Sequence, residues 1–428
     1  MAKLTDDLRF RGLIHQVSDE SLLDALDAGG LTVYIGFDPS SDSLHMGNLL
    51  QLCNLRRLQE AGHRPIVLAG GATGMIGDPG GRREERQLLD REQLAHNLAG
   101  ITPQLQRFLD FSEDAGTRRA IFVNNADWIA RLSFIDFLRD VGKHFSVNQM
   151  VSKESVRSRL DRQEQGISFT EFSYMLIQAY DFLHLFDDYG CTLQMGASDQ
   201  WGNITMGIDL IRRVRAKPAY ALTSPLVLKS DGTKFGKSEE GALYLDANLT
   251  SPFALYQYFV RLEDEIVGTY LRFFTFLSHD AILELDQQTE QHPQDRAAQR
   301  ELAREIVELV HGKDERVRVE RAVEALYGES ISELDAETLL LALDDAPTST
   351  FKRSALDAGE IDIVDVLVQS GLVNSKNIAR QTLAQGGVYV NNRRVDADTS
   401  VLSPTALIAG RYLLIRRGRR DLHLLDFV

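Results

Sequence analysis

The sequence predicts an α/β fold in which a mostly parallel, Rossmann-like sheet carries helices on both faces. In the first half of the chain, short and almost continuous apolar runs alternate with longer amphipathic stretches. Parallel strands that are buried on both faces have this composition, and the helices between them supply the crossovers. Ligands bind such sheets beyond the carboxyl ends of the strands, so we expect the functional residues there.

Individual elements of this sheet can be placed from the apolar runs. The strands are expected at 31–35, 65–69, 121–123 and 192–195. An amphipathic stretch at 46–61 is predicted as a helix that Gly62 ends as a C-terminal cap. The strand at 31–35 is followed by a break at 36–39, which begins the first motif discussed below.

The second half of the chain predicts a helical domain and a small α+β unit. A long amphipathic helix is expected at 296–310, and a later helix has Ser375 as its N-cap. A strand at 388–390 leads into an Asn391-Asn392 turn. The predicted borders are 1–228 for the sheet domain, 229–245 for a mobile lysine loop, 246–330 for the helical domain, 331–358 for a linker and 359–428 for the terminal unit.

Composition limits the class of protein. The 428 residues are 43% hydrophobic and 25% charged, as in ordinary globular proteins, and no apolar run is long enough to span a bilayer. Cys53 and Cys191 are far apart, which argues against a disulfide framework and favours reduced thiols in the cytoplasm. The ten histidines and two cysteines show no metal-ligand spacing, so we expect no metal held by the protein itself.

Charge is distributed unevenly along the chain. The net charge is −15, yet residues 371–420 hold nine basic and two acidic residues, a local charge of +7 that leaves −22 for the remainder. A basic terminal unit on an acidic body indicates that a polyanion contacts the C-terminal end.

The first motif runs from Tyr34 to Asn48 and opens the 46–61 helix. Ser43 is expected to cap a helix that begins at Leu44, which puts His45 in the first turn, where free N–H groups suit a phosphate. His45 and Asn48 are three residues apart, so they face the same side and can both donate hydrogen bonds. A solvated helical turn explains His-Met-Gly-Asn alone equally well.

The second motif is a lysine-rich loop at 229–238. Lys234 and Lys237 are three residues apart among glycines, so both can reach one anion and stabilise charge on a leaving pyrophosphate. A solvated surface turn remains an alternative. A P-loop is excluded because it needs glycine at position 231, which is Asp231. The turn at 70–78 lacks the dinucleotide fingerprint but offers Asp78 as an acceptor.

A third motif places polar residues on one helical face. Tyr174, Gln178 and Asp181 have the spacing i, i+4 and i+7, which is typical of one side of a helix. Among apolar neighbours such a stripe can line a polar pocket, although a solvated face is an equal alternative. The stretch 194–203 follows a predicted strand and adds Gln194, Asp199 and Gln200 at the same sheet edge.

Taken together, these motifs resemble those of the class I aminoacyl-tRNA synthetases. His-Met-Gly-Asn at 45–48 and Lys-Phe-Gly-Lys-Ser at 234–238 resemble the two signature motifs of that class. Longer stretches at 34–39, 77–79, 142–148 and 198–204 narrow the resemblance to the bacterial tyrosyl-tRNA synthetases, and it covers nearly the whole chain. Residues 361–427 resemble the alpha-L RNA-binding domain of the ribosomal protein S-four type.

The resemblance implies a role for each matching residue. The catalytic set would be His45, Asn48, Arg82, Arg86, Lys234 and Lys237. Tyrosine would be bound by Tyr34, Asp78, Asn124, Tyr174, Gln178, Asp181 and Gln194. ATP and the adenylate would contact Gly36, Asp38, Ser40, His45, Gly47, Asn48, Asp199, Gln200 and Lys237. The basic residues expected to bind tRNA are Lys376, Arg380, Arg393, Arg394, Arg416 and Arg417.

The implied reaction is ATP-dependent activation of L-tyrosine to tyrosyl-AMP, followed by transfer to the 3′ end of tRNA(Tyr). The resemblance further implies Mg²⁺ bound with ATP, a homodimer with Phe169 near its interface, and no membrane or DNA partner. Three positions depart from a common pattern, namely Asn48 for a histidine, Arg82 for a lysine and Ala126 for a tyrosine. An equivalent ligase for tryptophan and a non-catalytic RNA-binding protein with a synthetase-like body remain alternatives.

Overall fold

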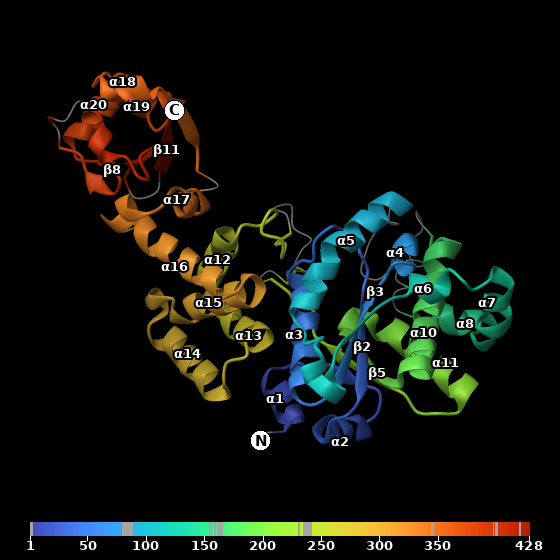
Figure 1. The fold of residues 1–428 in the computed structure, drawn as a ribbon. Coiled ribbons are helices and arrows are strands. Elements are labelled where there is room, and N and C mark those ends of the chain that lie inside the picture. Colours follow the sequence, from blue (N-terminus) through green and yellow to red (C-terminus); the bar gives the residue numbers. More distant parts are fainter. Residues whose placement is uncertain are drawn as a thin grey trace. The chain divides into compact units, whose positions relative to one another are not determined.

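The computed structural model describes residues 3–78, 89–153, 156–157, 160, 166–229, 232–233, 242–327, 329–343, 346–396, 398, 401–418 and 421–428. These residues form two compact units (Figure 1). Unit 1 comprises Met1–Thr250 and Phe259–Ile306, and unit 2 comprises Ser251–Tyr258 and Val307–Val428. The helical segment 259–306 therefore belongs to the compact unit of the parallel sheet, whereas the sequence predicted a separate helical domain from 246 to 330.

Unit 1 is built on a six-stranded sheet of order β1-β6-β5-β2-β3-β4. Neighbouring strands are parallel except for the edge pair β1 and β6, so the predicted fold class is confirmed. The four predicted strands are present, and the short β1 and the less apolar β6 were not predicted. The strands are β1 Gln16–Val17, β2 Thr32–Phe37, β3 Arg64–Ala69, β4 Ile121–Asn124, β5 Cys191–Ala197 and β6 Tyr220–Ser224.

Helices cover both faces of this sheet, with α3 and α5 on one side and α10 and α11 on the other (Figure 1). The α-helices of unit 1 are α1 Leu4–Phe10, α2 Ser21–Ala28, α3 Met46–Glu60, α4 Thr73–Ile76, α5 Arg91–Arg107, α6 Ala126–Ile129, α7 Phe134–Asp140, α8 Val147–Val151, α10 Phe169–Tyr189, α11 Trp201–Arg215, α13 Asp264–Phe274 and α14 His279–Gln291. The 3-10 helices here are η1 Glu113–Arg118, η2 Gly142–His144, η3 Ser198–Gln200 and η4 Pro293–Asp295. Helices α12 Pro252–Val260 and α15 Ala297–His311 cross the borders of the units.

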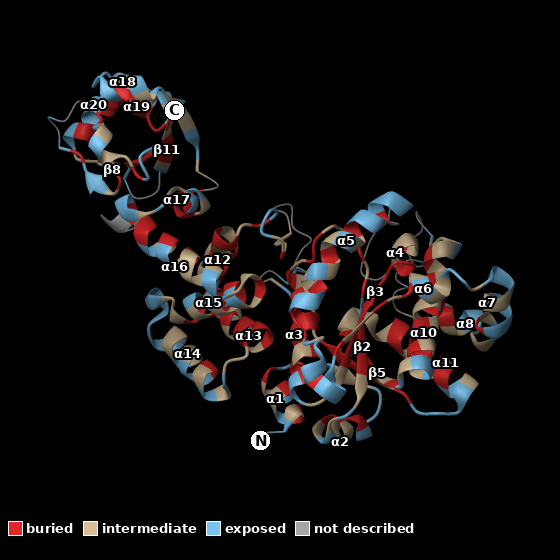
Figure 2. Cartoon of the chain, viewed as in Figure 1, coloured by how far each residue is buried: buried red, intermediate tan, exposed pale blue. Residues whose placement is uncertain are grey.

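Alternation along the strands divides their side chains between the two faces. Tyr34 of β2, Ile66 and Leu68 of β3, and Val123 of β4 pack in one core cluster with α10 and α11. Helix α3 packs on β2 and β3 and also contacts α13, and most of its residues are buried (Figure 2). Both cysteines are buried free thiols.

The start of α3 differs from the prediction. The helix begins at Met46, and His45 is its N-cap rather than a residue of the first turn. The imidazole Nδ1 of His45 accepts from the backbone N–H of Gly47 at 3.1 Å, and Asn48 Oδ1 accepts from the His45 N–H at 3.1 Å. This reciprocal capping box satisfies the donors that Ser43 was expected to cover. The Ser43 hydroxyl instead donates to the Leu44 carbonyl and accepts from the Asp246 N–H.

Unit 2 ends in a second, mostly antiparallel sheet of order β7-β11-β10-β8-β9 that packs against α18, α19 and α20. Ser375 caps α20, and Asn391 and Asn392 turn the chain with positive φ, both as predicted. The elements are α16 Lys313–Tyr327, η5 Glu329–Glu333, α17 Ala336–Ala342, β7 Thr348–Phe351, α18 Arg353–Asp357, α19 Ile363–Gln369, α20 Lys376–Ala384, β8 Val388–Val390, β9 Arg393–Arg394, η6 Pro404–Ala406, β10 Tyr412–Arg417 and β11 Asp421–Phe427.

The stretch predicted as a linker, 331–358, contains structure. Strand β7 pairs in parallel with β11, from Thr348 opposite Leu424 to Phe351 opposite Phe427. The sheet of the terminal unit therefore includes residues from the stretch predicted as a linker. Its first strand was missed because Thr-Ser-Thr-Phe has no apolar alternation. Among the described residues, no helix has both the length and the hydropathy needed to cross a membrane.

Candidate functional site

A cavity of about 330 Å³ lies in unit 1, where β2 and β5 end and α3 and η3 begin. The end of β6 leads into its wall through 225–227. It brings together most of the predicted site residues. These are Tyr34, Gly36, Asp38, Ser40, His45, Gly47, Asn48, Asp78, Tyr174, Gln178, Asp181, Gln194, Asp199 and Gln200. The face of α10 that carries Tyr174, Gln178 and Asp181 thus lines a polar cavity.

Five predicted residues are not among those lining it. Arg82, Arg86, Lys234 and Lys237 lie outside the described residues. Asn124 is described, but its Oδ1 accepts from the Ala126 N–H at 2.9 Å and packs where a side chain on Gly71 would stand. Asn124 ends β4, and the next residue, which begins the turn into α6, points toward the site instead.

One end of the cavity is lined by two buried residues of neighbouring strands, Tyr34 and Gln194. Tyr34 of β2 is completely buried, and its hydroxyl has no hydrogen-bond partner among the described residues. Burial, and then the charge of nearby Asp181, raise the pKa of Tyr34 well above 10, so the phenol is neutral. Gln194 is paired with Tyr34 in the sheet register and presents an unpartnered Oε1.

Two residues that the sequence did not indicate hold the carboxylate of Asp181. Asn125 Nδ2 donates to Asp181 Oδ2 at 2.9 Å, and Trp128 Nε1 donates to Asp181 Oδ1 at 2.7 Å. Asn125 Oδ1 also accepts from the Ala72 N–H at 2.7 Å. Burial raises the pKa of Asp181 to about 7, and these two donors oppose that rise because they favour the charged form.

The middle of the cavity is organised around Asp38. The Tyr174 hydroxyl donates to Asp38 Oδ2 at 2.8 Å, and the Thr73 hydroxyl donates to Oδ1 at 2.7 Å. The carboxylate lies so close to Gly70 that a Cβ there would stand 2.0 Å from Oδ1. Glycine at position 70 is therefore required by the position of Asp38, whereas the sequence predicted only a turn at 70–78.

A second chain of polar contacts crosses the cavity from α10 to η3. Gln200 Nε2 donates to Asp78 Oδ2 at 2.6 Å, and Gln178 Nε2 makes a long contact of 3.5 Å to Gln200 Oε1. Gln178 Oε1 is buried and without a partner among the described residues. An acceptor beside the carboxylate of Asp78 is suited to a ligand ammonium group.

The other end of the cavity is formed by the start of α3. Because Nδ1 of His45 accepts a hydrogen bond, the neutral imidazole carries its proton on Nε2. Asn48 uses its Oδ1 on the His45 N–H, which leaves the amide N–H groups as donors. Gly47 was expected to make room for a nucleotide, but it is the His45 ring that a Cβ at Gly47 would meet, at 2.9 Å.

The described lining of the cavity is strongly acidic. It holds the carboxylates of Asp38, Asp78, Asp181 and Asp199, and no lysine or arginine among the described lining residues. No group of three or more His, Cys, Asp or Glu in the described part of the chain is placed to hold a metal ion. Such a lining attracts cations, so a bound triphosphate needs positive charge from elsewhere.

The basic residues predicted for RNA binding lie in unit 2. Arg380, Arg393, Arg394 and Arg417 are exposed, and Lys376 forms an ion pair of 2.5 Å with Asp365. Arg416 differs, because it is 8% exposed and donates to Asn392 Oδ1 at 2.8 Å. By alternation along β10, Arg416 lies on the face opposite the core residues Leu413 and Ile415, where it is buried, unlike the four exposed arginines.

Comparisons with known proteins agree with this geometry. The model of the family described as "tRNA synthetases class I (W and Y)" matches residues 27–328, and a "Tyrosine--tRNA ligase SYY-like C-terminal domain" matches 341–425. The Tyrosine--tRNA ligases of Roseiflexus castenholzii and Bacillus caldotenax are 50% and 46% identical to this chain. The first similarity covers 100% of both chains, and the second covers 99% of both.

A solved structure is similar as well. The crystal structure of a C-terminally truncated mitochondrial tyrosyl-tRNA synthetase from Aspergillus nidulans superposes with a TM-score of 0.68 at 32% identity, covering 76% of this chain and 95% of that one. The fold is thus that of a ligase of the class I type. The chain belongs to the class I tRNA synthetases, in the family of the tyrosine–tRNA ligases.

The contacts of Asp181 predict how its ionisation responds to substitution. Trp128→Phe removes one N–H donor from the carboxylate, so the pKa of Asp181 should rise above its value of about 7. We expect a shift of about one pH unit, the size of a hydrogen bond to a charged group. Infrared difference titration of the protonated carboxyl measures this, with Asp181→Asn to assign the signal.

Trp201→Phe is the matched control for this experiment, because the other tryptophan of the chain has no contact with Asp181 in the structure. An Asp181 titration that is the same in Trp128→Phe and the unaltered protein would show that the indole N–H does not hold the carboxylate.

Proposed function

We propose that the protein activates L-tyrosine with ATP to tyrosyl-AMP and pyrophosphate, and transfers the tyrosyl group to the 3′ end of tRNA(Tyr). The observation that carries this proposal is the pair formed by the unpartnered Tyr34 hydroxyl and the Asp181 carboxylate in one buried end of the cavity. Leaving a buried phenol without a partner is costly, so the site favours a ligand that completes it.

A ligand hydroxyl is the group that fits between these two residues. It can donate its proton to Asp181 and accept from the Tyr34 hydroxyl at the same time. A phenylalanine ring would leave both protein groups unpaired. An indole N–H can donate but not accept, so tryptophan would leave Tyr34 without an acceptor. This is the reason for preferring tyrosine over the tryptophan alternative.

The rest of the cavity suits the remaining groups of tyrosine and ATP. Asp78, Tyr174 and Gln178 surround the place of the α-ammonium group, which donates to Gln178 Oε1 and the carboxylates. Gln194, the neighbour of Tyr34 in the sheet, lies along the place of the aromatic ring of the substrate tyrosine. Gly36, Asp38, Ser40, Asp199 and Gln200 then lie toward the ribose and adenylate, next to the His45 and Asn48 donors at the start of α3.

Activation proceeds by attack of the tyrosine carboxylate on the α-phosphorus of ATP, with pyrophosphate leaving in line. Arg82, Arg86, Lys234 and Lys237 supply the positive charge that the described lining lacks, together with Mg²⁺ bound to the ATP phosphates. The terminal ribose hydroxyl of tRNA then attacks the tyrosyl carbonyl and releases AMP. We place this reaction in the cytoplasm, where ATP and tRNA are found.

The decisive test is ATP–pyrophosphate exchange with each amino acid in turn. Exchange should depend on tyrosine, and Lys237→Ala should lower its rate at least tenfold while tyrosine binding, measured by equilibrium dialysis, stays within about twofold. A lysine outside the loop, Lys217→Ala, serves as the control. Exchange driven by tryptophan instead of tyrosine, or by no amino acid, would refute the proposal.

The basic unit at the C-terminus is proposed to bind tRNA through its phosphates, by Arg380, Arg393, Arg394, Arg417 and Lys376. Arg416 is withdrawn from this set because of its burial. The predicted domain roles stay with this proposal, with the unit beginning at about residue 346 so that β7 is included.

Removal of this unit tests its role. Deletion of residues 346–428 should leave tyrosine-dependent exchange within about threefold, while charging of tRNA falls more than tenfold, because activation needs only the cavity of unit 1. Deletion from 357 onward is the companion variant, and it leaves β7 without its partner β11. Loss of exchange and charging together in both truncated chains would mean that the unit is needed for folding and not for tRNA.

We propose in addition that the protein is a homodimer. Seven large apolar side chains between residues 134 and 169 are exposed, most of them on α7 and α8, which Figure 2 shows as little buried. They are Phe134, Ile135, Leu138, Val147, Val151, Leu160 and Phe169. An apolar surface of this extent is typical of a protein interface, and Phe169, the first residue of α10, is 70% exposed.

The double variant Ile135→Glu and Phe169→Glu should therefore be a monomer at micromolar concentration, because burying two carboxylates in a twofold interface costs several kcal/mol. Sedimentation velocity measures this. Leu283→Glu, at an apolar residue of α14 that is 45% exposed, should leave the dimer intact. A monomeric unaltered protein would refute the proposed dimer.

A further inference from the structure

The lysine-rich segment, residues 229–245, is held at its start by a tyrosine of the helical segment 259–306 of unit 1. The Tyr270 hydroxyl of α13 donates to the Leu228 carbonyl at 2.9 Å. Leu228 directly follows Val227, which lines the cavity, and precedes a turn closed by the Lys229 N–H on the Thr233 carbonyl at 2.8 Å. Tyr270 thus fixes the last residue before that turn.

The phenol of Tyr270 has little freedom to move. It is 1% exposed and packs edge-on against Phe274, with ring centroids 5.4 Å apart, and against Phe259. A rigid aromatic ring with only its hydroxyl reaching a backbone carbonyl is a precise anchor. The position of the Leu228 carbonyl therefore depends on the position of α13.

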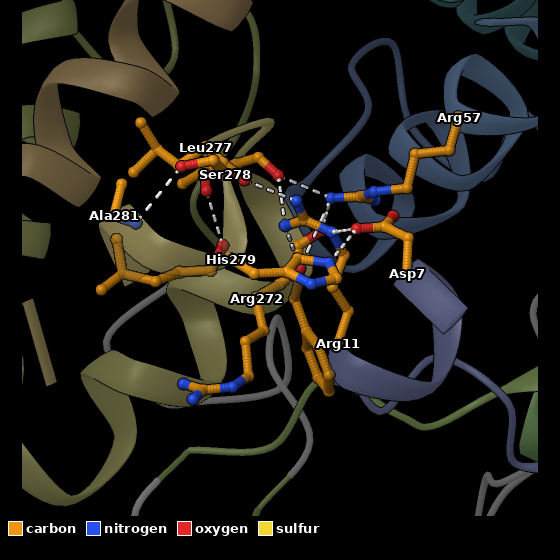
Figure 3. Close-up of polar contacts among 11 residues, drawn as sticks. Asp7, Arg11, Arg57, Arg272, Leu277, Ser278, His279 and Ala281 are labelled. Atoms are coloured by element: carbon orange, nitrogen blue, oxygen red, sulfur yellow. Dashed lines mark hydrogen bonds and ion pairs between the residues drawn. The ribbon is translucent and has the colours of Figure 1, made fainter. Parts of the chain in front are cut away.

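Helix α13 is in turn fastened to α3 and α1 (Figure 3). The buried guanidinium of Arg57, near the end of α3, donates to the carbonyls of Phe273 at 3.0 Å and Thr275 at 2.8 Å. Arg11, just after α1, donates to the carbonyls of Thr275 at 2.9 Å and Leu277 at 2.7 Å. Cations at a helix C-terminus satisfy its last carbonyls and favour its dipole.

The far end of the lysine-rich segment returns to the start of α3. The Met46 N–H donates to the Leu243 carbonyl at 3.1 Å, and the Leu245 N–H donates to the Leu44 carbonyl at 2.8 Å. His45 and Tyr244 thereby form an antiparallel bridge. Both ends of the lysine-rich segment are consequently attached to α3. Its end pairs with the chain beside His45, and its start is connected to α3 through Tyr270, α13 and Arg57.

From this circuit we infer that Tyr270 is a positioning residue for the lysine turn and hence for the departure of pyrophosphate. The inference rests on the proposed function, because Lys234 and Lys237 follow this turn in the chain. Tyr270 touches no substrate and acts by holding the Leu228 carbonyl. Loss of its hydroxyl frees one end of the segment and weakens an interaction that matters more in the transition state than in the ground state.

Tyr270→Phe keeps the ring and removes only the hydroxyl. In single-turnover experiments we expect the rate constant for tyrosyl-AMP formation to fall about three- to tenfold, the factor that one hydrogen bond corresponds to. The KM for pyrophosphate in the reverse reaction should rise, and the Kd for tyrosine should stay unchanged. The control is Tyr189→Phe, at the end of α10 and beside the amino end of β5, away from the cavity.

A double-mutant cycle separates positioning from a general structural effect. In a background of Lys234→Ala and Lys237→Ala, the added Tyr270→Phe should change the rate less than twofold, because the groups it positions are gone. A full three- to tenfold loss in that background, a weakened tyrosine affinity, or an unchanged rate in the single variant would each overturn the inference. Absence of tyrosyl-AMP with the unaltered protein would instead refute the proposed function.

Discussion

The position of α3 is the constraint on which the end of the cavity at His45 and Asn48 depends. This helix packs between the parallel sheet and α13, so neither of its ends can shift alone. Its N-terminus carries the capping box of His45 and Asn48 into the cavity. Arg57 in its last turn donates to the carbonyls of Phe273 and Thr275 at the end of α13. A single rigid element thus relates the phosphate-facing donors to the helical segment that follows the sheet in sequence.

The end of the cavity at Tyr34 depends on a different constraint, the balance between the charged and the protonated form of the buried Asp181 carboxyl group. Desolvation disfavours the charge of Asp181 and would by itself keep the group protonated near neutral pH. The hydrogen bonds from Asn125 and Trp128 favour the carboxylate, so that a modest further donor is enough to fix it in the charged form. A ligand hydroxyl is such a donor. In the proposed function such a ligand completes the site, because the Tyr34 hydroxyl has no other partner among the described residues.

The sequence predicted the sheet, the cavity edge and most of the lining because these follow from short-range patterns. Apolar runs located four strands, and helical spacing put Tyr174, Gln178 and Asp181 on one face. Asn125 and Trp128 could not be predicted, since their value comes from contacts with Asp181 more than fifty residues later in the chain. The strand β7 was missed for the same reason: its pairing with β11, and not its own composition, makes it a strand.

Arg416 and Asn124 show the limit of reading residue types without geometry. An arginine in a basic stretch predicts a phosphate contact, yet Arg416 is buried on the face of β10 opposite Leu413 and Ile415, where it donates to Asn392. The resemblance implied a substrate contact for Asn124, yet Asn124 accepts from the Ala126 N–H in the turn into α6, and the neighbouring Asn125 holds the carboxylate of Asp181.

Charge is divided across the cavity in a way that matches the chemistry of two unlike substrates. The described lining is acidic, which suits the ammonium group of an amino acid but repels a triphosphate. The basic groups that a triphosphate needs are separated from this lining in the sequence, in the segments that follow Asp78 and Lys229. Cations built into the acidic wall would pair with its carboxylates and occupy the place of the ammonium group. In the proposed function, keeping them on separate segments lets each substrate meet charge of the opposite sign.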